Sequence, residues 1–147
     1  MSRRGGFTLV ELFVVIMILG ILAAVAVPKM VVTTNTATDN SLRQSLSVVR
    51  DAIEMYAAQN TGKLPGDNFE TEIRTYLRGG LPVCPVGAKN ALVEICNVDP
   101  DADGFIATGD TSKAWRYNKK DGQFIANTND DSNEKDAAGT AIPYAKF

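Results

Sequence analysis

A long apolar stretch lies near the start of the chain, directly after the short segment 1–6. Between residues 7 and 27, 21 consecutive positions carry a single charge, that of Glu11. In a helix these residues rise about 31 Å, enough to cross a bilayer core about 30 Å thick. The pattern therefore predicts a membrane-spanning helix close to the N-terminus.

After residue 40 the apolar positions become periodic. They recur at spacings of four, three, four and three, which places them on one face of a helix. The stripe consists of Leu42, Leu46, Val49, Ile53 and Tyr56. Because Gly62 and Pro65 are residue types that end helices, the sequence predicts one long helix from Phe7 to about Asn60. A head domain is expected to cover its second half.

A shorter apolar face follows the long helix. It is formed by Phe69, Ile73, Tyr76 and Leu77. Asp67 and Glu70 have the spacing of a helix cap, so a second helix is expected at about 68–78.

The rest of the head has strand patterns. Strands are predicted at 91–96, 114–117 and 123–126, and the last two flank a loop in which Gly122 would supply a positive φ. The polar residues 127–136 are expected to form a mobile surface loop. The fold class is therefore α+β, with a small antiparallel sheet packed on the long helix.

Glu11 is the unusual residue of the apolar segment, because a carboxylate inside a membrane helix needs a partner. Cleavage after Gly6 would create an ammonium group on Phe7, and the Glu11 of a neighbouring helix displaced by about one turn could pair with it. Arg3 and Arg4 would hold the leader on the cytoplasmic side, so the head would face outward.

Two other hypotheses account for the apolar segment. An ordinary signal peptide could be cut after the small residues 24–26, which would make the head a secreted domain. An uncleaved membrane anchor is the second. Both leave Glu11 without a role.

The segment Gly6-Phe-Thr-Leu-Val-Glu-Leu12, followed by an apolar stretch and Pro28, closely resembles the processing signal of type IV pilins and type II secretion pseudopilins. The resemblance implies that a membrane-embedded aspartic peptidase cuts between Gly6 and Phe7 and methylates the new amine on Phe7. It also implies that Glu11 guides assembly into a filament of bundled helices. Pro28, with Gly20 as a second weak point, would kink or loosen the helix.

The chain then divides into four parts. Residues 1–6 are the cleaved leader, 7–30 the transmembrane and assembly helix, 31–62 the amphipathic half of the helix and 63–147 the head. The expected partners are pilin-like subunits of the same or another kind, the prepilin peptidase and methyltransferase, an inner-membrane assembly platform, and lipid before assembly.

Composition narrows the function. The absence of histidine excludes His-based triads and the commonest zinc ligand sets, and the net charge of −2 gives no reason to expect nucleic acid as the main partner. No catalytic residues are assigned, and the chain is expected not to be an enzyme.

Cys84 and Cys96 are the two cysteines of the chain. An exported head favours a disulfide between them, which would stabilise the fold by about 3 kcal/mol in the chain-entropy model. The alternative is two buried thiols that act as small apolar side chains.

One acidic loop has the spacing of a calcium site. Asp99, Asp101, Asp103 and Asp110 occupy loop positions 1, 3, 5 and 12, with a glycine at position 6. The loop lacks the usual bidentate glutamate and flanking helices, so a solvated acidic turn remains the alternative. Calcium is the only cofactor considered.

Three aromatic residues, Trp115, Tyr117 and Phe124, lie near basic residues and could stack on single-stranded DNA. Alternating residues of a hairpin more often fill a core. The sequence thus predicts a structural filament subunit anchored once in the inner membrane, with its head in the periplasm or on the cell surface. Pilus or pseudopilus remains open, and a minor pilin that binds DNA or a surface is the rival.

Overall fold

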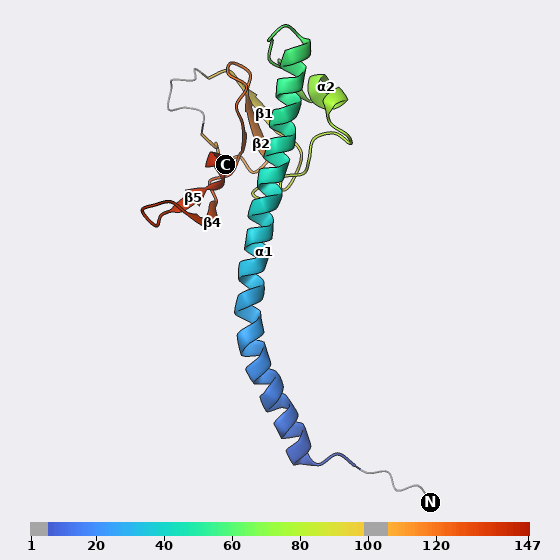
Figure 1. Cartoon of the computed structure of the whole chain (residues 1–147), viewed down its shortest axis with the longest axis vertical. Helices are drawn as coiled ribbons and strands as arrows, with labels where there is room; N and C mark the ends of the chain where they lie inside the picture. The colour runs from blue at the N-terminus through green and yellow to red at the C-terminus, as the bar shows by residue number, and fades with distance from the viewer. Residues whose placement is uncertain (1–5, 99–105) are drawn as a thin grey trace, which may run out of the picture. The chain divides into compact units, whose positions relative to one another are not determined.

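The computed structural model describes residues 6–98 and 106–147. The chain forms two compact units, Met1–Thr36 and Ala37–Phe147. One helix, α1, spans Leu9–Gln59 (Figure 1). The predicted long helix is therefore confirmed, with its start two residues later and its end one residue earlier than expected.

The second half of α1 contributes one side of the hydrophobic core of the head. Four of the five residues of the predicted stripe are buried there, with Leu42 and Val49 at 0% exposure and Ile53 at 3%, whereas Tyr56 is half-buried. The helix ends where Gly62, at a φ of 82°, donates its N–H to the carbonyl of Ala57 at 2.8 Å. This left-handed glycine closes the last turn, as the sequence predicted.

Three strands, β1 (Val93–Cys96), β2 (Trp115–Asn118) and β3 (Phe124–Ala126), form one sheet in that order. The hairpin prediction is confirmed, because β2 and β3 are antiparallel and Gly122 has a φ of 79°. The expectation of a purely antiparallel sheet was wrong, since β1 pairs with β2 in parallel. The long connection between them, residues 97–114, permits the chain to return in the same direction.

The aromatic side chains of the head lie inside it. Trp115, Tyr117 and Phe124 are at most 1% exposed, and the ring of Phe69 lies 4.1 Å from that of Tyr117. The indole N–H of Trp115 donates to the carbonyl of Pro82 at 2.9 Å. These residues are core, so the hypothesis of a DNA-stacking patch was wrong.

The second helix is shorter than predicted. Helix α2 spans Phe69–Ile73 and continues as a 3₁₀ turn, Arg74–Tyr76. The predicted cap is absent, because Asn68 at the N-cap makes no side-chain capping bond. Asp67 instead forms an ion pair with Lys119 at 2.6 Å.

The segment expected to be a polar loop contains a strand. Strand β4 (Asp131–Lys135) pairs with β5 (Ala141–Pro143) in a two-stranded antiparallel sheet. The prediction failed because β4 consists only of polar residues. Four of its five residues are exposed, and Ser132 alone is buried.

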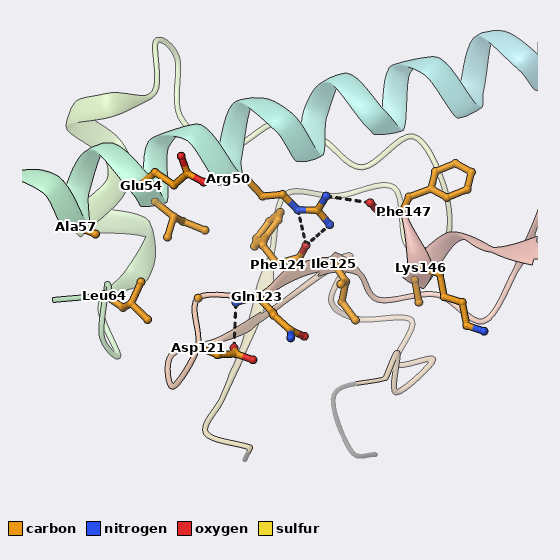
Figure 2. A pocket seen from close by; sticks show the side chains of 13 residues that line it. Arg50, Glu54, Ala57, Leu64, Asp121, Gln123, Phe124, Ile125, Lys146 and Phe147 are labelled. Atoms are coloured by element: carbon orange, nitrogen blue, oxygen red, sulfur yellow. Dashed lines mark hydrogen bonds between the residues drawn. The ribbon is translucent and has the colours of Figure 1, made fainter. Parts of the chain in front are cut away.

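The C-terminal 3₁₀ turn, Tyr144–Lys146, is hydrogen-bonded to α1. The Tyr144 hydroxyl donates to the buried carboxylate of Asp39 at 2.8 Å. The Arg50 guanidinium donates to the main-chain oxygens of Phe124 at 3.0 Å and Phe147 at 2.9 Å (Figure 2). These bonds hold both sheets of the head against the same helix.

The predicted disulfide is not formed in this structure. Cys84 and Cys96 are both free thiols. Cys84 is 1% exposed and belongs to the hydrophobic core, whereas Cys96 lies at the end of β1, opposite Asn118, and is half-buried. The arrangement corresponds to the alternative in which the cysteines act as small apolar side chains.

The burial of Cys84 predicts a loss of stability at alkaline pH. Burial raises the pKa of this thiol from 9.0 to about 11. Between pH 9 and 11 the folded chain therefore keeps a proton that the unfolded chain releases. The contribution of this thiol to the free energy of unfolding is fully present below pH 9 and is lost as the pH rises towards 11. The expected loss is about 2 to 3 kcal/mol. Urea unfolding of a fragment beginning at Ala37 would measure it, and an equal fall in Cys84→Ala would contradict the assignment.

Candidate functional site

Residues 6–8 precede the first turn of α1 and lie in the first compact unit. Gly6, Phe7 and Thr8 are outside the helix and exposed, and the side chain of Phe7 is 86% exposed. A Cβ placed on Gly6 would meet no atom within 4 Å. The peptide bond between Gly6 and Phe7 is therefore open to a processing enzyme.

Thr8 and Glu11 form a reciprocal cap at the start of α1. The Glu11 carboxylate accepts the Thr8 N–H at 2.9 Å and the Thr8 hydroxyl at 3.0 Å. The Thr8 hydroxyl in turn accepts the Glu11 N–H at 3.2 Å. This is a capping box, in which two N–H groups that the helix leaves unpaired are satisfied by side chains.

The capping box changes how Glu11 is understood. From sequence alone this carboxylate is expected to have no partner until a neighbouring subunit arrives. Thr8 supplies two neutral donors, and the positive end of the helix dipole also favours a negative charge at this position. The carboxylate is nevertheless exposed, so it can still accept a cation.

Sequence reasoning missed Thr8. Its signal was present, because a threonine three residues before a glutamate at the start of an apolar stretch is the pattern of a capping box. The prediction had assigned Glu11 entirely to an intermolecular role. The structure adds a local one.

Removing the Thr8 hydroxyl should loosen the first turn of α1. Thr8→Val deletes one acceptor and one donor, and the loss of such a cap costs about 0.5–2 kcal/mol. The Glu11 amide should then exchange its hydrogen about 2- to 30-fold faster in a micelle, whereas Thr8→Ser should exchange at the original rate. Equal exchange in Thr8→Val and the parent would show that the cap has no energetic role.

The first unit exposes all the apolar side chains described between residues 6 and 30. The apolar segment has a mean hydropathy of 2.9 over 18 residues, and none of this window is buried. By length and composition α1 is able to cross a membrane. A surface this apolar needs lipid or other helices to cover it.

Pro28 lies inside α1. Because proline has no N–H, the carbonyl of Ala24 cannot receive its usual helical bond. Nearby, the hydroxyl groups of Thr33 and Thr34 donate to the carbonyls of Lys29 and Met30 at 3.0 and 2.9 Å. The kink at Pro28 and Gly20 stays a prediction.

The candidate calcium loop is mostly outside the described residues. Asp99, Asp101 and Asp103 lie there, whereas Asp110 is described. Both oxygens of Asp110 accept bonds from Ser112 at 2.8 Å, which holds the pKa of this carboxyl below its usual range. Within residues 6–98 and 106–147 no three potential metal ligands are grouped. Calcium binding stays a prediction.

The N-terminal segment of the chain matches a known protein family. The family model described as the prokaryotic N-terminal methylation motif matches residues 1–27. Those residues contain the whole capping box and the Gly6–Phe7 bond.

The relatives whose alignments extend beyond this motif are of two kinds, type II secretion core proteins and a type IV pilus component. The chain is 30% identical to the type II secretion system core protein G of Klebsiella pneumoniae over 142 residues, which cover 82% of this chain and 100% of that protein. It is 42% identical to the type IV narrow pilus major component PilA5 of Thermus thermophilus over 60 residues, 41% of this chain and 52% of that protein. It is 39% identical to the core protein G of Pseudomonas aeruginosa over 62 residues, 41% of this chain and 44% of that protein. No solved structure is significantly similar.

Proposed function

Because the chain belongs to the pilin and pseudopilin family that includes type II secretion system core protein G, we propose that it is a structural subunit of a secretion pseudopilus. Proteins of this family are structural rather than catalytic, and the methylation motif implies processing by a prepilin peptidase. Within this family, we propose a pseudopilus rather than a surface pilus as the filament that the chain forms.

The observation that carries this choice is the extent of the similarity. The alignment with the Klebsiella pneumoniae protein spans the whole of that protein, so it includes the head as well as the helix. The alignment with the pilus component covers 41% of this chain. Because the N-terminal helix is common to both kinds of filament, the head is the part that distinguishes them.

Processing is the first step of the proposed function. The peptidase removes residues 1–6 by cutting the exposed Gly6–Phe7 bond, and the new amine on Phe7 is methylated. Before cleavage the chain is held in the inner membrane by α1, and its head faces the periplasm. After cleavage the subunit carries an ammonium group close to its own capping box.

Assembly is the second step. The ammonium group on Phe7 of one subunit pairs with the Glu11 carboxylate of a neighbour. An ion pair in a low-dielectric setting is favourable only when its geometry is good, so it fixes the axial displacement between the two helices. The capping box supports this step, because Thr8 orients the Glu11 carboxylate before the partner arrives.

The rival function is a minor pilin that binds DNA or a surface. DNA binding is no longer supported by the aromatic residues, since Trp115, Tyr117 and Phe124 fill the core. For adhesion to a surface, no specific feature of the described residues speaks in its favour.

Deletion of the gene tests the choice between the two filaments. Loss of a pseudopilus should leave the proteins normally secreted by the host trapped in the periplasm, while surface pili remain. Loss of surface pili with normal secretion would contradict the proposal. Complementation with the parent chain is the control.

A further inference from the structure

Residues 144–147 are held against one face of α1, and we call them the strap. The Tyr144 hydroxyl donates to the carboxylate of Asp39 at 2.8 Å. At the other end, the main-chain oxygen of Phe147 accepts a hydrogen bond from the Arg50 guanidinium at 2.9 Å (Figure 2). Both ends of the strap are therefore bonded to side chains of the same helix.

A third side chain of α1 binds the ring of Phe147. The central guanidinium carbon of Arg43 lies 4.0 Å from the centroid of this ring, which is the geometry of a cation–π contact. The rings of Phe147 and Tyr144 pack edge to face with their centroids 5.6 Å apart. Arg43 follows Asp39 by four residues and precedes Arg50 by seven, so the three side chains lie on one face of α1.

Both arginines also have a partner outside the strap. Arg43 forms an ion pair with Glu134 of β4, and Arg50 donates to the main-chain oxygen of Phe124 at 3.0 Å. Release of the strap would therefore leave neither guanidinium unpaired. The large free-energy cost of an unpaired buried charge does not arise for them.

Main-chain hydrogen bonds join the strap to the head at one end. Among the residues that the structure describes, one such bond leaves the strap, from the Tyr144 N–H to the carbonyl of Asp130 at 3.1 Å. The N–H of Phe147 donates within the strap, to the carbonyl of Tyr144 at 3.2 Å. Strand β5 ends at Pro143, so the pairing of β4 with β5 does not include the strap. The strap can therefore detach while both sheets stay paired.

Phe147 lines two cavities of the head, of about 430 Å³ and about 360 Å³. Arg50 and Glu54 also line both, and the lining residues on α1 run from Arg43 to Ala57. This stretch of helix is about 21 Å long. Without Phe147 the two cavities would join into one groove along this face of α1. The half-buried ring therefore occupies a space larger than itself, and its packing contacts are incomplete.

We propose that the strap is the exchangeable occupant of a peptide-binding groove on α1. The strap opens at Pro143 as one unit while the sheets stay folded, and the groove then accepts a peptide with the same groups. The present occupant defines this class of ligand. It carries an aromatic ring for Arg43, a main-chain oxygen for Arg50 and, three residues earlier, a hydroxyl for Asp39. The inference goes beyond the proposed function and does not depend on it.

Hydrogen exchange in the full chain, held in a micelle, tests the opening. Phe147→Ala removes the ring at one end of the strap, and the amide of residue 144 reports on the other end. This amide should exchange about tenfold faster, because the two ends open together, while the amides of Trp115 and Tyr117 keep their parent rates. Unchanged exchange at residue 144 would overturn the strap as a unit. Equal acceleration at Trp115 and Tyr117 would overturn it too, because the whole head would then be opening.

Tyr76→Phe is the matched control for Tyr144→Phe. Both substitutions delete one hydroxyl that donates to a side chain of α1, but Tyr76 bonds to Gln59 at 2.9 Å, away from the strap. Tyr144→Phe deletes the partner of the buried Asp39 carboxylate and should accelerate exchange at residue 144 about tenfold. Tyr76→Phe should leave it at the parent rate. Equal rates in the two variants would contradict the proposal.

A peptide added in trans tests the groove. In Phe147→Ala the strap is weakened, so an excess of a free peptide with the sequence of residues 141–147 should occupy the groove. Leu46 lines the smaller cavity together with Phe147, and its methyl resonances should return to their parent positions along a saturable curve. A peptide with alanine at its last position should bind at least about tenfold more weakly. No saturable shift, or equal affinities of the two peptides, would overturn the groove as a peptide site.

Discussion

Replacing Glu11 by alanine is expected to abolish filament assembly while membrane insertion and processing continue. Alanine removes the only charge of the apolar segment, so the helix becomes easier to insert. The Gly6–Phe7 bond is unchanged, so the leader is still removed. The cation on Phe7 of each neighbour, however, has lost its partner, and an unpaired charge buried between helices costs several kcal/mol. Chemical cross-linking between subunits in whole cells and the size of the membrane-bound subunit measure the two outcomes.

Glu11→Gln is the informative control, because the structure gives Glu11 two roles. Glutamine can still form the capping box with Thr8, but it carries no charge. Failure of Glu11→Gln to assemble would assign the effect to the ion pair. Normal assembly of Glu11→Gln alongside failure of Glu11→Ala would assign it to the cap, and the pairing argument would be refuted.

Replacing Trp115 by alanine is expected to destabilise the head more than any surface change. The side chain is fully buried, its N–H is bonded to Pro82, and its ring lies 5.1 Å from that of Phe124. Loss of a core tryptophan costs about 3–5 kcal/mol, a large part of the 5–15 kcal/mol that stabilises a typical domain. Urea unfolding of a fragment beginning at Ala37 is the measurement.

Leu92→Ala provides the comparison for this prediction. Leu92 is 52% exposed, so its truncation should change the free energy of unfolding by less than about 1 kcal/mol. If Trp115→Ala were as mild as Leu92→Ala, the indole would have to lie at the surface. The stacking-patch hypothesis would then return.

The parts of the fold that sequence predicts best are those with a long or specific pattern. The stripe from Leu42 to Tyr56 repeats over four helical turns, and Gly122 is placed where a hairpin needs a positive φ. Local geometry determines both features, so one segment contains the information. The match of residues 1–27 to the methylation motif likewise depends on a local pattern, whereas the role of Glu11 in assembly stays a prediction.

The parts that sequence did not predict depend on distant contacts. Strand β4 has no apolar residue to mark it, and the segment around it is held by Tyr144 bonded to Asp39, 105 residues earlier. The parallel pairing of β1 with β2 depends on the course of the long connection between them. In the site, the cap formed by Thr8 is a local feature with a local signal, since a threonine three residues before a glutamate marks a capping box.

The mass of the mature N-terminus tests the central claim most directly. The claim is that α1 is an assembly element released by processing, with a leader that ends at Gly6. Mass spectrometry of the subunit isolated from membranes or filaments should give a chain that begins at Phe7 and carries one methyl group on its amine. A chain that begins at Val27 would contradict the account, because the apolar segment would then be a discarded signal peptide and the head a secreted domain.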